Sequence, residues 1–306
     1  MTLETIQSSA PTLRSEHPVE PSTAKGTEAR SPSRRAARTI VSRTAGRPHG
    51  PVNRLFSPGD LGGLLKPFVF LDHFDIAAQS TSRFPMHPHS GIATTTILLE
   101  GEVRYEDTTG ASGVLSAGSV EWMNAGGGVW HDGYPEGRTR VRGYQLWTAL
   151  PRELELAEPV SQYLSVDKIP QTGPVRVILG QYEGAQSPVL APRGLNYLHV
   201  RLSAGERWQY TPPADHAVAW VSVQRGALYT GGDRIRAEVA VFNQSEDVLE
   251  FTVDEDTEFV LGSAVPHPHD LVMGYYSVHT SREALQTGEA GIVKIGEQLR
   301  RSGRIR

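Results

Sequence analysis

The chain has 306 residues, of which 38% are hydrophobic and 21% are charged, a composition typical of a globular protein with a sizeable core. Its formal net charge of −4 argues against a chain-wide basic surface for nucleic acid. It contains no cysteine, which excludes disulfides, thiolate nucleophiles and iron–sulfur clusters. Because it also shows no membrane-length apolar run and no signal-peptide pattern at its start, we expect a cytoplasmic protein that does not bind membranes.

The first stretch of the chain differs from the rest in composition. Residues 1–38 hold eleven Ser or Thr and no aromatic residue, so they offer little apolar surface to bury. We predict that residues 1–37 form a disordered tail. The basic end of this tail, RSPSRRAAR, could bind an anionic partner, but composition favours a solvated segment.

Strand signals dominate everything after the tail. Residues 38–155 contain short β-branched and aromatic runs between Gly and Pro residues, and a second such series fills residues 156–280. The acidic, Pro-bearing stretch between the two series predicts a boundary near residue 155. Residues 281–306 carry two weakly helical stretches, SREALQTG and IVKIGEQLRR, and Ser281 could cap the first. The pattern predicts an all-β sandwich or barrel.

An internal repeat supports two similar domains. TTTILLEGEVRYEDTTG, around Gly101, resembles AWVSVQRGALYTGGDRI, around Gly226, 125 positions later. Each segment has an apolar run, a turn at glycine and a second strand. The match favours two copies of one β domain.

The strongest chemical signal is the sequence FPMHPHSG. In a strand, His87 and His89 would point to the same face, and two imidazoles on one inward face form half of a metal site. A third histidine, His131, follows the glycine-rich turn NAGGG, which could bring it opposite the pair. Taken alone, a His-x-His pair is more often a hydrogen-bonded or surface pair than a ligand pair.

A longer stretch resembles the pirin family of bicupins. The resemblance lies in His87-Pro88-His89, in Leu99-Glu100-Gly101, in Asp107-Thr108, and in Trp122–Gly128 leading into His131. Flanking strands similar to the family's are PFVFLDHFD and GYQLWTALP, so the close match covers about residues 38–151. The second half matches mainly through the repeat and the closing segment VMGYYSVHTSREAL.

The resemblance implies a fold and a metal site. It implies two tandem cupin (jelly-roll) β-barrels, with a metal in the N-terminal barrel that is usually iron (Fe2+). The family's histidine ligands map onto His87, His89 and His131. The family's carboxylate ligand maps onto Gly133, and its other acidic position maps onto Ala93, so this chain lacks both carboxylates.

The missing carboxylate limits what the resemblance implies about catalysis. Three neutral imidazoles can hold a metal with open positions, but metal selection among Fe, Ni, Cu, Zn and Mn becomes less certain. Glycine cannot act as a general base, and the catalytic residues are therefore unknown. Asp132, Glu121 and His73 are candidates for a direct role, although strand alternation would point Asp132 away from a ligating His131.

The remaining markers have structural explanations. Trp122, Trp130 and Trp147 are expected to be core aromatics rather than substrate platforms. The second domain is expected to lack a metal site, because no His-x-His precedes the Gly226 hairpin. The late pair His267 and His269, like His279, is interpreted as a loop or edge feature.

Three functions remain open from the sequence. The first is an iron-dependent dioxygenase resembling quercetin 2,3-dioxygenase, which would act on an aromatic, flavonol-like substrate. The second is a non-catalytic metal-binding or redox-sensing regulator or scaffold that binds a protein partner. The third is a degenerate cupin without a metal.

Overall fold

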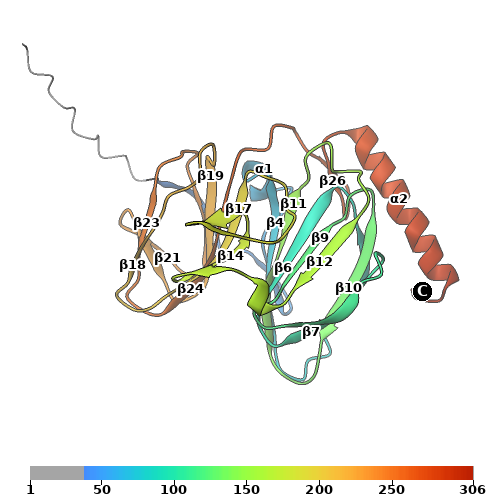
Figure 1. The fold of residues 1–306 in the computed structure, drawn as a ribbon, viewed down its shortest axis with the longest axis horizontal. Coiled ribbons are helices and arrows are strands. Elements are labelled where there is room, and N and C mark those ends of the chain that lie inside the picture. Colours follow the sequence, from blue (N-terminus) through green and yellow to red (C-terminus); the bar gives the residue numbers. More distant parts are fainter. Residues whose placement is uncertain (1–37, 306) are drawn as a thin grey trace, which may run out of the picture. The chain divides into compact units, whose positions relative to one another are not determined.

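The computed structural model describes residues 38–305, and within them β-strands form two barrels, as predicted (Figure 1). The tail predicted at residues 1–37 lies outside the described residues. Each barrel consists of one seven-stranded and one four-stranded antiparallel sheet.

The first barrel contains the histidine motif. In spatial order, its seven-stranded sheet consists of β12 (Val160–Leu164), β9 (Val120–Asn124), β6 (Ile92–Glu100), β11 (Val141–Ala149), β4 (Phe68–Ile76), β3 (Val52–Phe56) and β2 (Arg47–His49). Its four-stranded sheet consists of β5 (Phe84–His89), β10 (Val129–Pro135), β7 (Glu102–Asp107) and β8 (Ser112–Ser116).

The second barrel has the same plan. Its seven-stranded sheet consists of β1 (Ile40–Thr44), β22 (Glu238–Phe242), β19 (Val218–Arg225), β24 (Thr257–Ala264), β17 (Leu195–Leu202), β14 (Val175–Leu179) and β13 (Gln171–Thr172). Its four-stranded sheet consists of β18 (Arg207–Tyr210), β23 (Leu249–Thr252), β20 (Leu228–Thr230) and β21 (Asp233–Ile235).

The remaining elements are short, apart from one helix. They are the strand pairs β15 (Gln181–Tyr182) with β16 (Ala185–Gln186) and β25 (Val272–Met273) with β26 (Val278–His279), and the helices α1 (Leu61–Leu64), η1 (Val166–Lys168) and α2 (Arg282–Arg301). None of the helices in residues 38–305 combines the length and the apolar character that crossing a membrane requires.

The two barrels are structural copies of each other. Position by position, the strand order of one seven-stranded sheet corresponds to that of the other, with β6 and β19 in equivalent places. The hairpins predicted as repeats, β6–β7 and β19–β20, both turn at a glycine with positive φ, 81° at Gly101 and 79° at Gly226. The duplication inferred from the sequence is therefore confirmed by topology.

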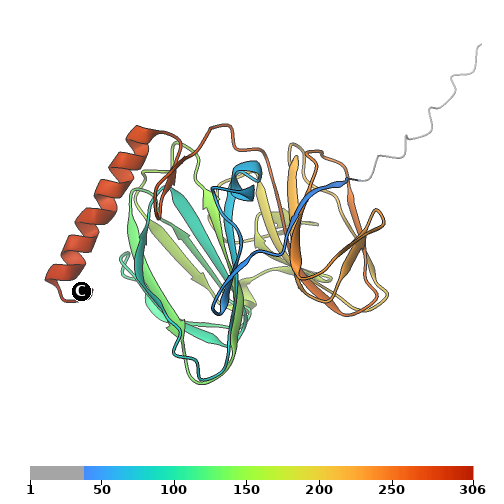
Figure 2. The ribbon, with the colours of Figure 1, turned by 180° about the vertical axis from the view of Figure 1, so that it is seen from behind.

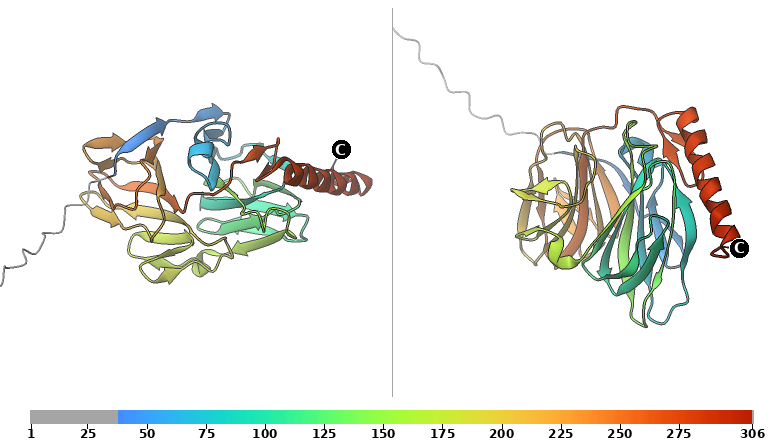
Figure 3. Two further views of the ribbon diagram at one scale, coloured as in Figure 1. Left: turned by 90° about the horizontal axis from the view of Figure 1, so that it is seen from above. Right: turned by 45° about the vertical axis from the view of Figure 1, so that its right-hand side comes forward.

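One apolar cluster joins the two barrels. It contains Trp122, Tyr144 and Leu146 from the first large sheet together with Tyr197 and Trp220 from the second. Figures 2 and 3 show the two large sheets facing each other. Both faces of these sheets are therefore buried, which removes the alternation of apolar and polar residues expected of a half-exposed strand.

Strand β6 illustrates this burial. All but the last of its nine residues are buried. Ala93 and Ile97 belong to the cluster between the barrels, whereas Ile92 and Leu98 belong to clusters inside the first barrel. Because each face meets a different core, the strand is an unbroken run of apolar and Thr residues.

Each large sheet takes its edge strand from outside its own contiguous segment. Strand β1 precedes the first barrel in sequence but pairs with β22 of the second. Strand β12 follows the predicted boundary at residue 155 but pairs with β9 of the first. The division into domains at residues 38–155, 156–280 and 281–306 stays a prediction, and strand pairing runs across it.

The C-terminal segment forms one continuous helix rather than two short ones. Helix α2 begins after Ser281, whose side chain accepts a hydrogen bond from the Ala284 N–H, as predicted. Glycines inside the helix weakened the helical signal. The structure explains all three, because a Cβ would crowd His279 at Gly288, the Gly127 carbonyl oxygen at Gly291 and the Trp130 ring, at 2.8 Å, at Gly296. The helix lies along β10 on the outside of the first barrel (Figure 1).

The hairpin turn at Gly101 offers a test of this fold. A Cβ on Gly101 would lie 2.2 Å from the carbonyl oxygen of Arg140, whereas a Cβ on Gly110, which also has positive φ, would have no atom within 4 Å. We expect Gly110→Ala to lower the free energy of unfolding by about 1 kcal/mol, from backbone conformation alone. Gly101→Ala should lower it by about 3 kcal/mol, because crowding adds to that term. Urea denaturation measures both, and equal losses would contradict the close approach at Gly101.

Candidate metal centre

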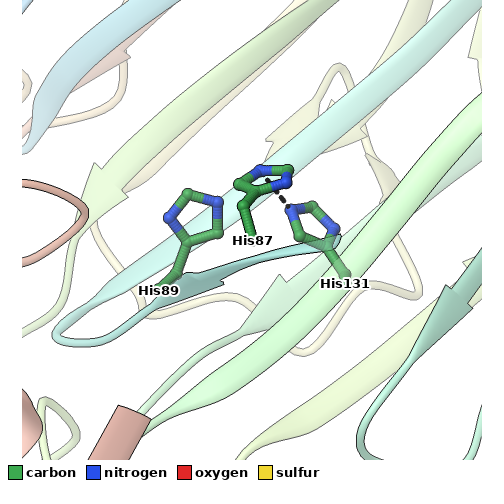
Figure 4. A group of neighbouring side chains, drawn as sticks. All are labelled: His87, His89 and His131. Carbon is green, nitrogen blue, oxygen red and sulfur yellow. Dashed lines mark hydrogen bonds between the residues drawn. The ribbon is translucent and has the colours of Figure 1, made fainter. Parts of the chain in front are cut away.

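Neighbouring strands bring the three predicted histidines together. His87 and His89 lie two residues apart on β5, so both side chains point into the barrel. His131 on β10 is the direct cross-strand partner of His87, and Val129 is that of His89. The glycine-rich turn leads into β10 as expected, and one Nδ1 or Nε2 atom of each histidine lies within 4.8 Å of the others (Figure 4).

A hydrogen bond at Nδ1 fixes the orientation of each ring. The acceptors are the carbonyl oxygen of Pro85 for His87 at 2.7 Å and that of Tyr276 for His89 at 3.2 Å. For His131, Nδ1 lies 3.4 Å from the carboxylate of Glu121. Carbonyl and carboxylate oxygens only accept hydrogen bonds, so we assign the proton of each neutral imidazole to Nδ1. Each Nε2 then carries an unprotonated lone pair.

These lone pairs face one another. The Nε2 atoms of His87 and His131 lie 3.1 Å apart, within hydrogen-bonding distance (Figure 4), so the contact is favourable only with a proton or a metal ion between the two nitrogens. The Nε2 atom of His89 is buried and has no hydrogen-bond partner among the described residues. A buried nitrogen without a partner is costly, and a metal ion would satisfy all three.

Burial keeps the imidazoles in the state that binds metals. Burial, and to a lesser extent repulsion from the neighbouring His131, lowers the pKa of His87 from 6.5 to about 3. Desolvation, followed by His87, also holds the pKa of His89 well below its ordinary value. The neutral form of both rings is therefore favoured in mild acid as well as at neutral pH.

Glu121 is the charged group behind His131. It lies on β9, is 7% exposed, and accepts hydrogen bonds from the Thr96 hydroxyl at 2.6 Å and the Tyr163 hydroxyl at 3.3 Å. Burial alone would raise the pKa of Glu121, but the contacts with His131 and the Thr96 hydrogen bond outweigh it and lower that pKa. The single proton of the Tyr163 hydroxyl is shared with Asp107, whose oxygen is the closer acceptor at 2.9 Å.

An aromatic and apolar cavity adjoins the histidines. Its lining includes His87, His131 and Glu121, and its remaining walls are mainly apolar or aromatic, including Phe74, Phe84, Val103, Tyr105, Leu115 and Tyr163. Gly133 also lines this cavity. A Cβ at Gly133 would make only ordinary van der Waals contacts, the nearest with Val103 at 3.4 Å, so the backbone has room for a side chain there.

The other candidates from the sequence lie outside the three-histidine group, although Asp132 lines the adjoining cavity. Ala93 belongs to the cluster between the barrels, on the opposite face of β6 from the histidines. His73 contacts Tyr144 and is influenced by Arg142 and Glu258, which also places it at the interface between the barrels. Asp132 contributes no atom to the three-histidine group.

The three tryptophans have structural contacts. Trp122 is buried between the barrels, and the Trp130 indole N–H donates to the Ile292 carbonyl of α2. Trp147 stacks on Phe70 and meets the edge of His89, with ring centroids 4.8 Å apart. It therefore supports a candidate ligand as well as the core.

The C-terminal segment supports the metal-site strand from behind. The Ser90 hydroxyl, next to His89, donates to the Ser277 hydroxyl at 2.9 Å and lies 3.0 Å from His279 Nε2. The other nitrogen of His279 contacts Glu155 at 3.2 Å. The four side chains of this network are each at most 2% exposed. His279 is thus a buried structural residue.

The late histidine pair lies in the loop between β24 and β25. His267 contacts the backbone carbonyls of His269 and Leu150. Neither histidine of this pair belongs to the three-histidine group found among the described residues. The second barrel carries aromatic side chains, Trp208, Tyr210 and Phe251, on the strands equivalent to β5 and β10.

Sequence reasoning missed the groups that orient the histidines. Two of them, at Pro85 and Tyr276, are backbone carbonyls and leave no sequence signal. Tyr163 lay in the stretch interpreted as a link between domains. Glu121 was not missed as a residue, because it was among the candidates for a direct role, but its place behind His131 was not predicted.

The fold and the three-histidine group define a two-barrel cupin with a candidate metal site in its N-terminal barrel. Comparison with known proteins specifies the family. Residues 52–148 match the Pirin family model. A Pseudomonas aeruginosa protein named "Putative quercetin 2,3-dioxygenase" is 34% identical over 251 residues, covering 77% of this chain and 87% of the relative. The chain belongs to the pirin family.

Further relatives and solved structures agree. A pirin-like protein of Arabidopsis thaliana is 32% identical over 240 residues, covering 72% of this chain and 76% of the relative. The crystal structure of a quercetin 2,3-dioxygenase from Acinetobacter baumannii has a TM-score of 0.78 and 25% identity, covering 87% of this chain and 98% of that one. A bacterial pirin from Escherichia coli, solved with nickel(II), has a TM-score of 0.59 and 21% identity, covering 72% and 94%, and shows the shared fold.

The buried His73 predicts how stability depends on pH. Burial, and to a lesser extent repulsion from the Arg142 cation, lowers the pKa of His73 from 6.5 to about 4. Between these values the unfolded chain binds more protons, so the free energy of unfolding falls as pH drops from 6.5 to 4. We expect His73→Phe to reduce the loss between pH 7 and pH 4 by about 3 kcal/mol. Urea denaturation at both pH values checks this, and parallel pH profiles would contradict it.

Proposed function

We propose that this protein binds one metal ion through Nε2 of His87, His89 and His131. The observation that carries the proposal is the convergence of these nitrogens, with each Nδ1 bonded to an oxygen acceptor and His89 Nε2 left without a partner. Three imidazoles fit Fe, Ni, Cu and Zn. We propose Fe2+ as the physiological ion, with Ni, Cu, Zn and Mn as alternatives.

We further propose a dioxygenase-like oxidoreductase activity on an aromatic, flavonol-type substrate. The names of the Pseudomonas and Acinetobacter relatives support this substrate class. The cavity beside the histidines supports it too, because Phe74, Phe84 and Tyr105 offer faces and edges for a planar ring and exclude water. When bound, iron would supply a redox-active Lewis acid beside that cavity.

A specific observation favours a second candidate function. The position of the family's carboxylate is Gly133, which cannot accept a proton from a substrate hydroxyl. A metal-binding or redox-sensing regulator that binds a protein partner needs no such base.

The cytoplasmic location and the absence of nucleic-acid binding stay predictions.

Metal binding is tested first. Protein purified without a His tag should contain close to one equivalent of a transition metal by elemental analysis. Adding Fe2+ or Ni2+ at 100 times the dissociation constant should stabilise the metal-free protein by about 2.7 kcal/mol, and His89→Ala should abolish that gain. His216→Ala, which changes a buried histidine of the second barrel, is the control that should retain it. Absence of metal together with no stabilisation would favour the metal-free cupin.

Catalysis is tested by restoring the carboxylate. Because a Cβ at Gly133 would make only ordinary contacts and the residue lines the cavity, Gly133→Glu should fold and place a carboxylate beside His131. We expect metal affinity to rise about tenfold or more, and metal-dependent oxygen uptake with quercetin to increase. Gly133→Gln is the control, because glutamine has the shape of glutamate but no charge. If wild type and Gly133→Glu both bind iron but consume no oxygen with quercetin, the regulator function is favoured.

A further inference from the structure

The candidate metal site has oxygen acceptors behind all three rings, but they differ in charge. The acceptors for His87 and His89 are neutral backbone carbonyls, whereas the acceptor for His131 is the carboxylate of Glu121. Negative charge on the acceptor strengthens the hydrogen bond and raises the basicity of the opposite ring nitrogen.

The position of Glu121 excludes direct ligation in the observed geometry. Its oxygen Oε1 faces Nδ1 of His131, on the side of the ring away from the converging Nε2 atoms. Its other oxygen, Oε2, is held by the Thr96 hydroxyl. Glu121 therefore touches the site through His131.

The neighbouring acidic residues, Asp107 and Asp132, make no hydrogen bond to the three histidines. Asp107 accepts hydrogen bonds from the backbone and hydroxyl of Thr109 and from the Ala111 N–H, and it reaches Glu121 only through Tyr163. Asp132 has a buried oxygen without a hydrogen-bond partner and no contact with an imidazole nitrogen. Among the described acids, Glu121 is the one hydrogen-bonded to a histidine of the group.

We propose that Glu121 is a positioning residue that replaces, from behind His131, the negative charge that Gly133 cannot supply to the metal. This inference rests on the proposed metal binding. The carboxylate holds His131 as the Nδ1–H tautomer with Nε2 directed at the ion, and its charge reaches the ion through the ring. The chain thereby keeps an anionic group near the metal while leaving the cavity side of the site open at Gly133.

The test compares two buried carboxylates that contact a histidine. Glu121→Gln retains shape, and the Thr96 hydroxyl can reverse its hydrogen bond to suit the amide. Glu258→Gln is the matched control, because Glu258 is also buried and accepts from a histidine, His199, at 3.1 Å, but lies at the interface between the barrels, where it pairs with Arg142, and outside the three-histidine group. Apparent dissociation constants for Ni2+ and Fe2+ are measured by competition with a chelator, alongside urea denaturation of each metal-free variant.

We expect Glu121→Gln to weaken metal binding about ten- to a hundredfold, while Glu258→Gln leaves it unchanged. The midpoint potential of the Fe(III)/Fe(II) couple should rise in Glu121→Gln, because losing a negative charge destabilises Fe(III) more than Fe(II). Glu121→Asp, which keeps the charge, should stay closer to wild type in both measurements. A merely structural role would alter unfolding without moving the potential.

A double-mutant cycle gives the strongest form of the test. If Glu121 replaces the missing charge, Gly133→Glu should recover most of the affinity lost in Glu121→Gln. If Glu121→Gln fails to fold, Thr96→Val removes only the hydroxyl that holds the carboxylate and should still weaken binding, by less.

The outcomes separate this inference from the proposed function. Wild-type protein that binds no metal overturns the proposed function. Wild-type protein that binds metal, with affinity and potential unchanged in Glu121→Gln, overturns the role of Glu121 and leaves metal binding intact. Equal losses in Glu121→Gln and Glu258→Gln would also overturn it, because they would show a general effect of buried charge.

Discussion

The first barrel has to hold unprotonated imidazole nitrogens against one another inside a protein. Two of these Nε2 atoms lie 3.1 Å apart, which requires a proton or a metal ion between them, and the third is buried without a partner among the described residues. Three oxygen acceptors behind the rings prevent the imidazoles from turning to avoid this contact. Such a conflict between local energy and global fold is expected at a functional site.

The groups that maintain this arrangement come from distant parts of the chain. Tyr163, on the added edge strand β12, supports Glu121 and thereby His131. The segment before α2 supplies the Tyr276 carbonyl to His89 and the Ser277 and His279 side chains to Ser90. The first barrel is therefore complete only with residues that follow it, and shortening the chain at residue 155 would remove support from two of the three histidines.

Sequence reasoning succeeded where chemistry is local and failed where it depends on contacts across the fold. The i, i+2 spacing of His87 and His89 and the glycine-rich turn before His131 sufficed to predict that these rings meet. The duplicated hairpins sufficed to predict two similar barrels. In contrast, the role of Tyr163 depends on a strand pairing across a predicted boundary, and the glycine at residue 296 of α2 is explained by the close approach of Trp130. Neither contact leaves a periodic signal in the chain.

Gly133 and Glu121 together make sense of a site that lacks the family's carboxylate. A side chain at residue 133 would enter the aromatic cavity, so glycine there enlarges the space beside the histidines at the cost of a charge. A carboxylate behind His131 compensates for charge without occupying that space. It cannot take up a proton from a molecule in the cavity as a ligated carboxylate could, because its oxygens already face His131, Thr96 and Tyr163. Under the proposed metal binding, the exchange would therefore preserve the binding of an ion more readily than proton transfer.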